Sequence, residues 1–171
     1  FKSAPLHDIG KVGIPDRILL KPGKLTPDEF TIMKTHAALG REAIEQAEKE
    51  LGTPVEFLRF AKEIAHYHHE KWDGSGYPDG LAGDNIPIAA RLMAVADVYD
   101  ALISRRVYKP PFPQEKAVAI ITEGKGKHFD PDIIDAFTAI LPEFQDIARR
   151  YADTDRELEE QAKRMAGVAG E

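Results

Sequence analysis

The chain has 171 residues, of which 43% are hydrophobic and 30% charged, and its formal net charge is −6. This length and composition are typical of a single globular domain with a substantial core. The absence of cysteine excludes disulfide scaffolds, thiolate metal sites and thiol catalysis, so any metal must be held by His, Asp or Glu. The acidic balance argues against a DNA-binding protein, because affinity for a polyanion comes from Lys and Arg.

No apolar stretch approaches the ~20 residues that a transmembrane helix requires. The most apolar segment, Ile86 to Ile103, carries Arg91, Asp97 and Asp100. No secretory signal is recognisable either, so we expect a cytoplasmic protein without a membrane span. Because the sequence begins with Phe1 rather than Met, it is interpreted as part of a longer chain.

Helical patterns dominate the sequence and strand-like alternation is nearly absent, so the predicted fold class is all-α. Thr26, Pro27 and Glu29 form a strong helix start, because Thr26 can cap the helix, proline suits its first position and Glu29 completes a capping box. Apolar residues then recur at helical spacing as far as Ala47. This spacing places His36 near the inward face.

A second start of the same kind is predicted at Thr53–Glu56. The helix that follows is expected to run to about Glu70, with His68 on its inward stripe and His69 about 100° around the axis. Lys71–Pro87 is rich in glycine and proline and is predicted to be a long loop. Long ordered loops in compact domains are often functional.

Ile88–Ser104 is predicted to be a helix that is apolar nearly all round and therefore buried. Charged side chains there would be costly unless they were paired or bound to metal. Shorter helices are predicted at Gln114–Glu123 and from Asp130 onward. Residues 1–152 are interpreted as the main domain, and 153–171 as a charged helical tail that is peripheral or packs on a partner.

Histidine and aspartate side chains occur at four places on these apolar or buried stretches. They are His7 with Asp8, His36, His68 with His69, and Asp97. Imidazole and carboxylate ligands suit Mn, Fe, Ni or Zn, and a carboxylate such as Asp8 can bridge two ions. Two ions together can activate a water molecule and stabilise the leaving oxygen of a phosphodiester. Lys11, one turn beyond Asp8, could contact a phosphate oxygen.

Each of these residues also has a simpler interpretation. An inward histidine such as His36 is more often a hydrogen-bonded core residue, and Asp97 could be paired with Arg91 or with a backbone amide. Arg91 itself is interpreted mainly as a structural partner. Adjacent histidines at 68 and 69 are harder to explain by packing alone. The residues favour a metal site as a set, although no single pair is specific.

Two segments carry a family resemblance. His7-Asp8-Ile9-Gly10-Lys11 resembles the signature of the HD superfamily of metal-dependent phosphohydrolases. The block from His68-His69-Glu70 to Gly76-Tyr77-Pro78 resembles the hallmark of the HD-GYP family, which are bacterial cyclic di-GMP phosphodiesterases. The likeness runs from about Pro5 to Leu141. It implies an HD-domain helical bundle in which several helices supply ligands to a buried metal cluster.

The resemblance also implies roles for individual residues. The implied ligands of two or three divalent transition-metal ions (Fe, Mn, Ni or Zn) are His7, Asp8, His36, His68, His69 and Asp97. The implied catalytic residues are Asp8, as the bridging ligand, and Lys11, as a phosphate contact. Tyr77 is expected to line the substrate cleft, and Arg106 and Lys109 to hold the nucleotide phosphates. Without the family, a solvated loop is the simpler interpretation of Arg106 and Lys109.

One departure from the family concerns an upstream helix. The family's first histidine ligand lies on a helix before the His-Asp pair, sometimes with a glutamate that helps to hold a third ion. The sequence begins shortly before His7, so it does not include that helix. Whether the site holds two or three ions therefore stays open.

The activity implied by the resemblance is hydrolysis of cyclic di-GMP to linear pGpG, with further cleavage to GMP left open. Two alternatives remain: an HD phosphohydrolase acting on another nucleotide, and a non-catalytic module that binds GGDEF-type signalling partners. The Gly-Tyr-Pro loop weighs against the first, and the intact ligand set weighs against the second. By family analogy we expect an upstream receiver-type domain of a two-component system. A homodimer is left open.

Overall fold

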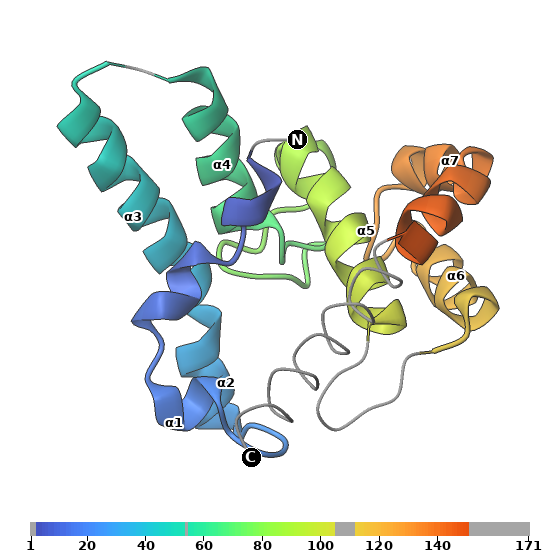
Figure 1. The fold of residues 1–171 in the computed structure, drawn as a ribbon, viewed down its shortest axis with the longest axis horizontal. Coiled ribbons are helices and arrows are strands. Elements are labelled where there is room, and N and C mark those ends of the chain that lie inside the picture. Colours follow the sequence, from blue (N-terminus) through green and yellow to red (C-terminus); the bar gives the residue numbers. More distant parts are fainter. Residues whose placement is uncertain (1–2, 54, 105–111, 151–171) are drawn as a thin grey trace, which may run out of the picture.

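The computed structural model describes residues 3–53, 55–104 and 112–150, and these residues form an all-helical fold (Figure 1). Their only β-type pairings are two isolated bridges, Asp73 with Ala82 and Lys125 with Phe129. The predicted all-α class is therefore confirmed. None of the helices in these ranges combines the length and apolar character needed to cross a lipid bilayer.

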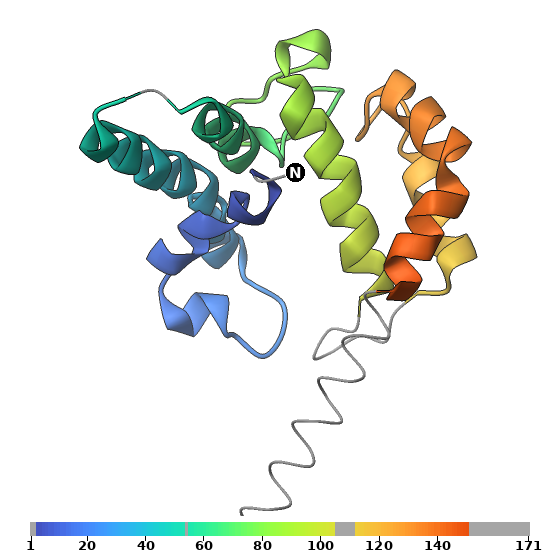
Figure 2. The same ribbon diagram turned by 45° about the horizontal axis from the view of Figure 1, so that its top comes forward.

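The helices form two groups on either side of α5 (Ile88–Ile103), as both ribbon views show (Figures 1 and 2). The first group contains η1 (Ala4–Leu6), η2 (Ile9–Gly13), α1 (Asp16–Leu19), α2 (Pro27–Lys34), α3 (His36–Leu51) and α4 (Glu56–Tyr67). A loop that includes η3 (Gly83–Asn85) leads from α4 into α5. The second group contains α6 (Gln114–Glu123), α7 (Pro131–Ala139) and the helical residues 141–150.

Each group has its own hydrophobic cluster. In the second group, Tyr99 of α5 packs edge-to-face against Phe137 and Phe144, with ring centroids 5.7 Å apart in both pairs. In the first group, Ile44 of α3 packs with Leu58 and its neighbours on α4. The inward stripe predicted for α4 is confirmed, because its apolar members are all buried.

Gly10 allows η2 to lie directly against α3. A Cβ atom built on Gly10 would be 1.9 Å from the carbonyl oxygen of His36 and 2.4 Å from the amide nitrogen of Gly40. Both are backbone atoms, which cannot move aside as a flexible side chain can. This contact brings Asp8, which immediately precedes η2, next to His36 at the start of α3.

Arg91 of α5 connects the loop before it to the second group. Its Nη1 donates hydrogen bonds to Asp130 at 2.7 Å and to Asp84 at 3.0 Å. Asp130 is buried, and its other oxygen accepts the amide of Asp132 at 2.8 Å, which caps α7 as its sequence predicts. The structural role expected for Arg91 is confirmed.

The predicted run of helical spacing from Thr26 to Ala47 is divided into two helices. The capping box of Thr26 and Glu29 forms as expected. However, α2 ends at Lys34, and α3 begins at His36. The hydroxyl of the intervening Thr35 donates to the carbonyl oxygen of Ile32 at 2.7 Å. Such local side-chain bonds compete with helix continuation, and a pattern of apolar spacing does not reveal them.

Three further details of the prediction are wrong. The helix α4 begins at Glu56 after an uncapped Val55, rather than with a cap from Thr53. It ends at Tyr67, so His68 and His69 lie in the turn beyond it and not on the helix. The helix α5 has the predicted range but is not buried all round, because large apolar side chains on one face, including Leu92, are exposed.

Two predictions lie outside the described residues. Arg106 and Lys109, the implied phosphate-binding residues, fall in the range 105–111. The tail 153–171 falls in the range 151–171.

Replacing Gly10 with Ala should lower the free energy of unfolding by at least about 2 kcal/mol, because the added methyl group meets backbone on α3. Urea denaturation of the purified variant measures this change. Val12→Ala is the matched control, since Val12 lies on the same short helix and is 85% exposed. Equal stabilities for the two variants would contradict the close packing of η2 on α3.

Replacing Asp130 with Asn should cost about 3 kcal/mol of stability, because Arg91 loses its buried anionic partner. Asn caps a helix as well as Asp does, so the substitution removes the ion pair with Arg91 but keeps the helix cap. Asp84→Asn removes the exposed partner of the same arginine and should change stability little. Thermal unfolding of both variants tests this, and a larger loss for Asp84→Asn would be inconsistent with it.

Candidate metal centre

Four side chains from separate parts of the chain converge beside the first residue of α3. Asp8, His36, His68 and His69 each offer one ligand atom, and these atoms all lie within 4.8 Å of one another. Asp8 comes from the turn between η1 and η2, and the two adjacent histidines come from the turn after α4. We call these four residues the donor cluster. All four are among the metal ligands implied by the sequence.

His7 and Asp97 extend the donor cluster toward α5. The Nε2 atom of His7 lies 3.3 Å from Oδ2 of Asp8 and 3.7 Å from Oδ1 of Asp97. The structure thus brings all six sequence-predicted ligands together. The alternative that Arg91 pairs with Asp97 is not supported, because Arg91 bonds to Asp84 and Asp130 instead.

Backbone carbonyl groups orient three of the histidine rings. In each ring, Nδ1 lies within 2.9 Å of a carbonyl oxygen. The three pairs are His7 with Ala4, His36 with Met33, and His68 with Ile64. When Nδ1 carries the proton it donates to the carbonyl oxygen, and the lone pair of Nε2 is left to point into the cluster. Metal-binding histidines are commonly fixed in this way.

The atoms that face the centre of the donor cluster have no hydrogen-bond partner within the described parts of the chain. They are Oδ1 of Asp8, Nε2 of His36 and Nε2 of His68. The two histidines are 1% and 2% exposed. A buried polar atom without a partner costs about 1–3 kcal/mol, and such atoms are rare. A shared cation would satisfy all three atoms at once, so the donor set fits a divalent metal ion.

The protonation states of His68, His69 and Asp8 suit metal binding. Burial lowers the pKa of His68 to about 4 and that of His69 to about 2, so both rings are neutral near pH 7. Burial also opposes ionisation of Asp8, but the polar contacts of Asp8 with His7 and Lys11 outweigh it and hold the pKa of this carboxyl below its usual range. The same carboxylate raises the pKa of His7. Neutral imidazole and ionised carboxylate are the forms that bind metals.

Lys11 lies at the edge of the donor cluster. Its Nζ atom donates to Oδ2 of Asp8 at 2.5 Å, and its side chain is 40% exposed. This ammonium group is therefore both fixed by Asp8 and accessible from solvent. An anionic substrate approaching the cluster would meet a positive charge there.

Tyr77 covers one side of the donor cluster. Its ring stacks on that of His69, with centroids 4.7 Å apart and an interplanar angle of 28°. Phe30 packs edge-to-face with Tyr77, with ring centroids 6.3 Å apart. Burial, together with the nearby carboxylates of Asp8 and Asp97, raises the pKa of the Tyr77 phenol, which is therefore un-ionised near neutral pH. The phenol thus stands beside the metal donors as a neutral group that can donate a hydrogen bond.

The sequence interpretation assigned no role to Glu70, although Glu70 is part of this site. Its carboxylate is buried and accepts hydrogen bonds from three backbone amides of the following loop. A signal was present in the sequence: an acidic residue directly after two adjacent histidines and before a glycine-rich loop. Loop amides need acceptors when they are buried, but the pattern alone does not say which amides bond to Glu70.

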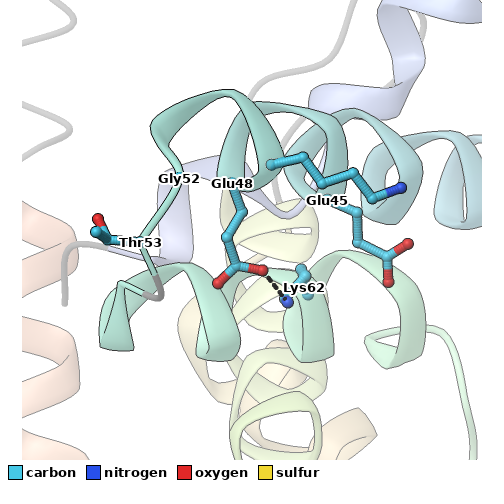
Figure 3. A pocket seen from close by; sticks show the side chains of 6 residues that line it. Glu45, Glu48, Gly52, Thr53 and Lys62 are labelled. Carbon is cyan, nitrogen blue, oxygen red and sulfur yellow. Dashed lines mark hydrogen bonds and ion pairs between the residues drawn. The ribbon is translucent and has the colours of Figure 1, made fainter.

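A separate pocket lies between the C-terminal part of α3 and the facing part of α4 (Figure 3). Its lining residues are Glu45, Glu48, Lys49, Gly52, Thr53 and Lys62. The ion pair between Lys62 and Glu48, at 2.5 Å, occupies part of it. The pocket contains no histidine and lies at the opposite end of α3 from His36, so it is not part of the donor cluster.

Comparison with known proteins agrees with this geometry. The family model described as HD domain matches residues 1–133. The chain is 66% identical, over 91% of its length, to a probable cyclic di-GMP phosphodiesterase of Vibrio cholerae, of which it covers 35%. It is 45% identical, over 88%, to the cyclic di-GMP phosphodiesterase response regulator RpfG of Xanthomonas campestris, of which it covers 38%.

A third relative is named for a different cyclic dinucleotide. The chain is 46% identical, over 83% of its length, to the 3'3'-cGAMP-specific phosphodiesterase 2 of Vibrio cholerae, of which it covers 26%. The chain therefore spans roughly a quarter to two fifths of the length of these relatives. The extent of the family match and the converging His and Asp side chains lead to one conclusion: the chain belongs to the HD domain family.

Proposed function

We propose that this chain is the catalytic part of a metal-dependent phosphodiesterase that hydrolyses cyclic di-GMP to pGpG. The observation that carries the proposal is the donor cluster, in which buried ligand atoms from three parts of the chain face one another and have no hydrogen-bond partner among the described residues. The substrate is inferred from relatives that are named cyclic di-GMP phosphodiesterases.

The proposed metal ligands are the donor cluster together with His7 and Asp97. Divalent ions bound there would supply Lewis-acid charge and an acidified water molecule as the nucleophile. We propose two or three ions, because the donors extend beyond the cluster through His7 to Asp97. Mixed imidazole and carboxylate ligands suit Fe, Mn, Ni or Zn.

The surrounding residues have distinct proposed roles. Asp8 holds Lys11 in place through a 2.5 Å hydrogen bond, and Lys11 then stabilises negative charge on the non-bridging phosphate oxygens. Tyr77 forms a wall of the substrate cleft beside His69. Arg106 and Lys109 are proposed to hold the nucleotide phosphates.

Cyclic di-GMP is preferred over cyclic GMP-AMP as the proposed substrate. The relatives named for cyclic di-GMP include one at 66% identity, whereas the relative named for 3'3'-cGAMP is 46% identical. A non-catalytic module that binds GGDEF-type partners is less well supported, because such a role does not require a group of buried ligand atoms that, in residues 3–53, 55–104 and 112–150, find no hydrogen-bond partner.

The proposed context is a longer bacterial signalling protein. RpfG is named a response regulator, which supports the proposal of an upstream receiver-type domain. We propose residues 1–152 as the catalytic domain and 153–171 as a helical tail. A cytoplasmic location is proposed because the substrate is an intracellular second messenger.

Asp8→Asn should lower kcat for cyclic di-GMP by at least about 100-fold, because the variant loses both a metal-binding charge and the partner of Lys11. The rate of pGpG formation, followed by chromatography in the presence of Mn²⁺, measures this. Asp16→Asn changes an exposed carboxylate on α1 and serves as the control. Wild-type turnover by Asp8→Asn would rule out the proposed role of Asp8.

Elemental analysis of the purified chain should find bound transition metal. His36→Ala should reduce the metal content, because it removes a ligand atom of the donor cluster. His128→Ala is the matched histidine control, since His128 stacks on Phe129 away from the donor cluster. A folded wild-type chain that binds no metal would favour the non-catalytic alternative.

A further inference from the structure

A buried carboxylate holds the loop that carries Tyr77. Glu70 is 2% exposed. Its Oε1 atom accepts the backbone amides of Asp79 at 2.7 Å and Gly80 at 3.0 Å, and its Oε2 atom accepts the amide of Leu81 at 3.1 Å. Hydrogen bonds to a charged acceptor are stronger than those between neutral groups. Glu70 therefore fixes three consecutive residues that follow shortly after Tyr77.

The same loop is held on the other side of Tyr77 by backbone contacts. The amide of Tyr77 donates to the carbonyl oxygen of His69 at 3.2 Å. A Cβ atom built on Gly76 would lie 2.4 Å from the amide nitrogen of Lys71 and 2.5 Å from Cα of Glu70. Gly76 is therefore required for the loop to pass this close to the segment that carries the histidine pair.

These contacts determine where the Tyr77 ring lies. Glu70 follows His69 directly in the chain, so the residue that anchors the loop is covalently joined to a member of the donor cluster. Held on both sides, Tyr77 has its ring stacked on His69 with centroids 4.7 Å apart. Asp79 adds a contact with α4, since Oδ2 of Asp79 lies 3.4 Å from Nε2 of His66.

We propose that Glu70 is a positioning residue for substrate binding. It does not belong to the donor cluster, and its carboxylate bonds to loop amides instead. By fixing the loop, it places Tyr77 as a wall of the nucleotide cleft, so its removal affects the binding of the cyclic dinucleotide rather than the chemical step. This inference rests on the proposed function.

The kinetic test compares Glu70→Gln with wild type in the full chain loaded with Mn²⁺. Glutamine has the same shape, but its amide group removes the charge and cannot accept a hydrogen bond at both ends. The KM for cyclic di-GMP should rise about tenfold, with kcat changed less than about twofold and the metal content unchanged. In a Tyr77→Ala background, Glu70→Gln should have no further effect on KM, because the positioned group is already absent.

Asp73→Asn is the matched control for a loop carboxylate. Asp73 is in the same loop and accepts hydrogen bonds from the amide and hydroxyl of Ser75, but it lies on the exposed side. The KM of the Asp73→Asn variant for cyclic di-GMP should equal that of wild type. The proposal is overturned if Glu70→Gln lowers kcat and metal content at unchanged KM, or if its effect on KM persists in full without the Tyr77 ring.

Amide hydrogen exchange tests the loop anchor independently of activity. In Glu70→Gln the amides of Tyr77 and Leu81 should exchange at least about tenfold faster than in wild type. The amide of Trp72, which donates to the carbonyl oxygen of His128 at 3.1 Å, should be unaffected and shows that the variant is folded. Unchanged exchange at Tyr77 and Leu81 overturns the proposal.

The failure of the proposed function can be told apart from the failure of this inference. If wild type fails to hydrolyse cyclic di-GMP, the proposed function fails, while hydrogen exchange still decides whether Glu70 holds the loop.

Discussion

The close contact between η2 and α3 is the constraint on which the rest of the site depends. Because Gly10 has no side chain, the backbone of η2 reaches the carbonyl oxygen of His36 and the amide of Gly40. This approach sets Oδ1 of Asp8 3.5 Å from Nε2 of His36. The turn after α4 then adds two more imidazoles, and burial keeps both of them neutral. A short, tightly packed segment thus delivers the one carboxylate of the donor cluster.

The helix α5 connects the site to the rest of the fold. Asp97 reaches His7 on one side, and Arg91 reaches the cap of α7 on the other. The loop before α5 takes part as well, since the amides of Trp72 and Asp73 donate to carbonyl oxygens just before α7. The second group of helices is thus joined to the surroundings of the donor cluster by polar contacts of α5 and this loop, because neither hydrophobic cluster includes a member of the donor cluster.

The sequence was sufficient to predict the helical class, because apolar spacing is a local signal. The convergence of the six candidate ligands was implied by the resemblance of the His-Asp and His-His motifs to the HD-GYP family. The sequence could not predict the break at Thr35, which depends on a hydroxyl bonding to a carbonyl oxygen three residues earlier. It also placed His68 and His69 on a helix that ends before them. The hydrogen bonds of Glu70 were not predicted because the amides that it binds lie nine to eleven residues later in the sequence. Helical and strand periodicity do not indicate contacts at that separation within a loop.

The most direct test of the central claim is an anomalous-scattering crystal structure of the chain grown with Mn²⁺. The predicted result is a metal peak enclosed by Asp8, His36, His68 and His69, within direct coordination distance of the imidazole nitrogen atoms. A well-ordered structure in excess metal with no peak at this place, or with the metal bound only elsewhere, would contradict the assignment of the donor cluster as a metal centre.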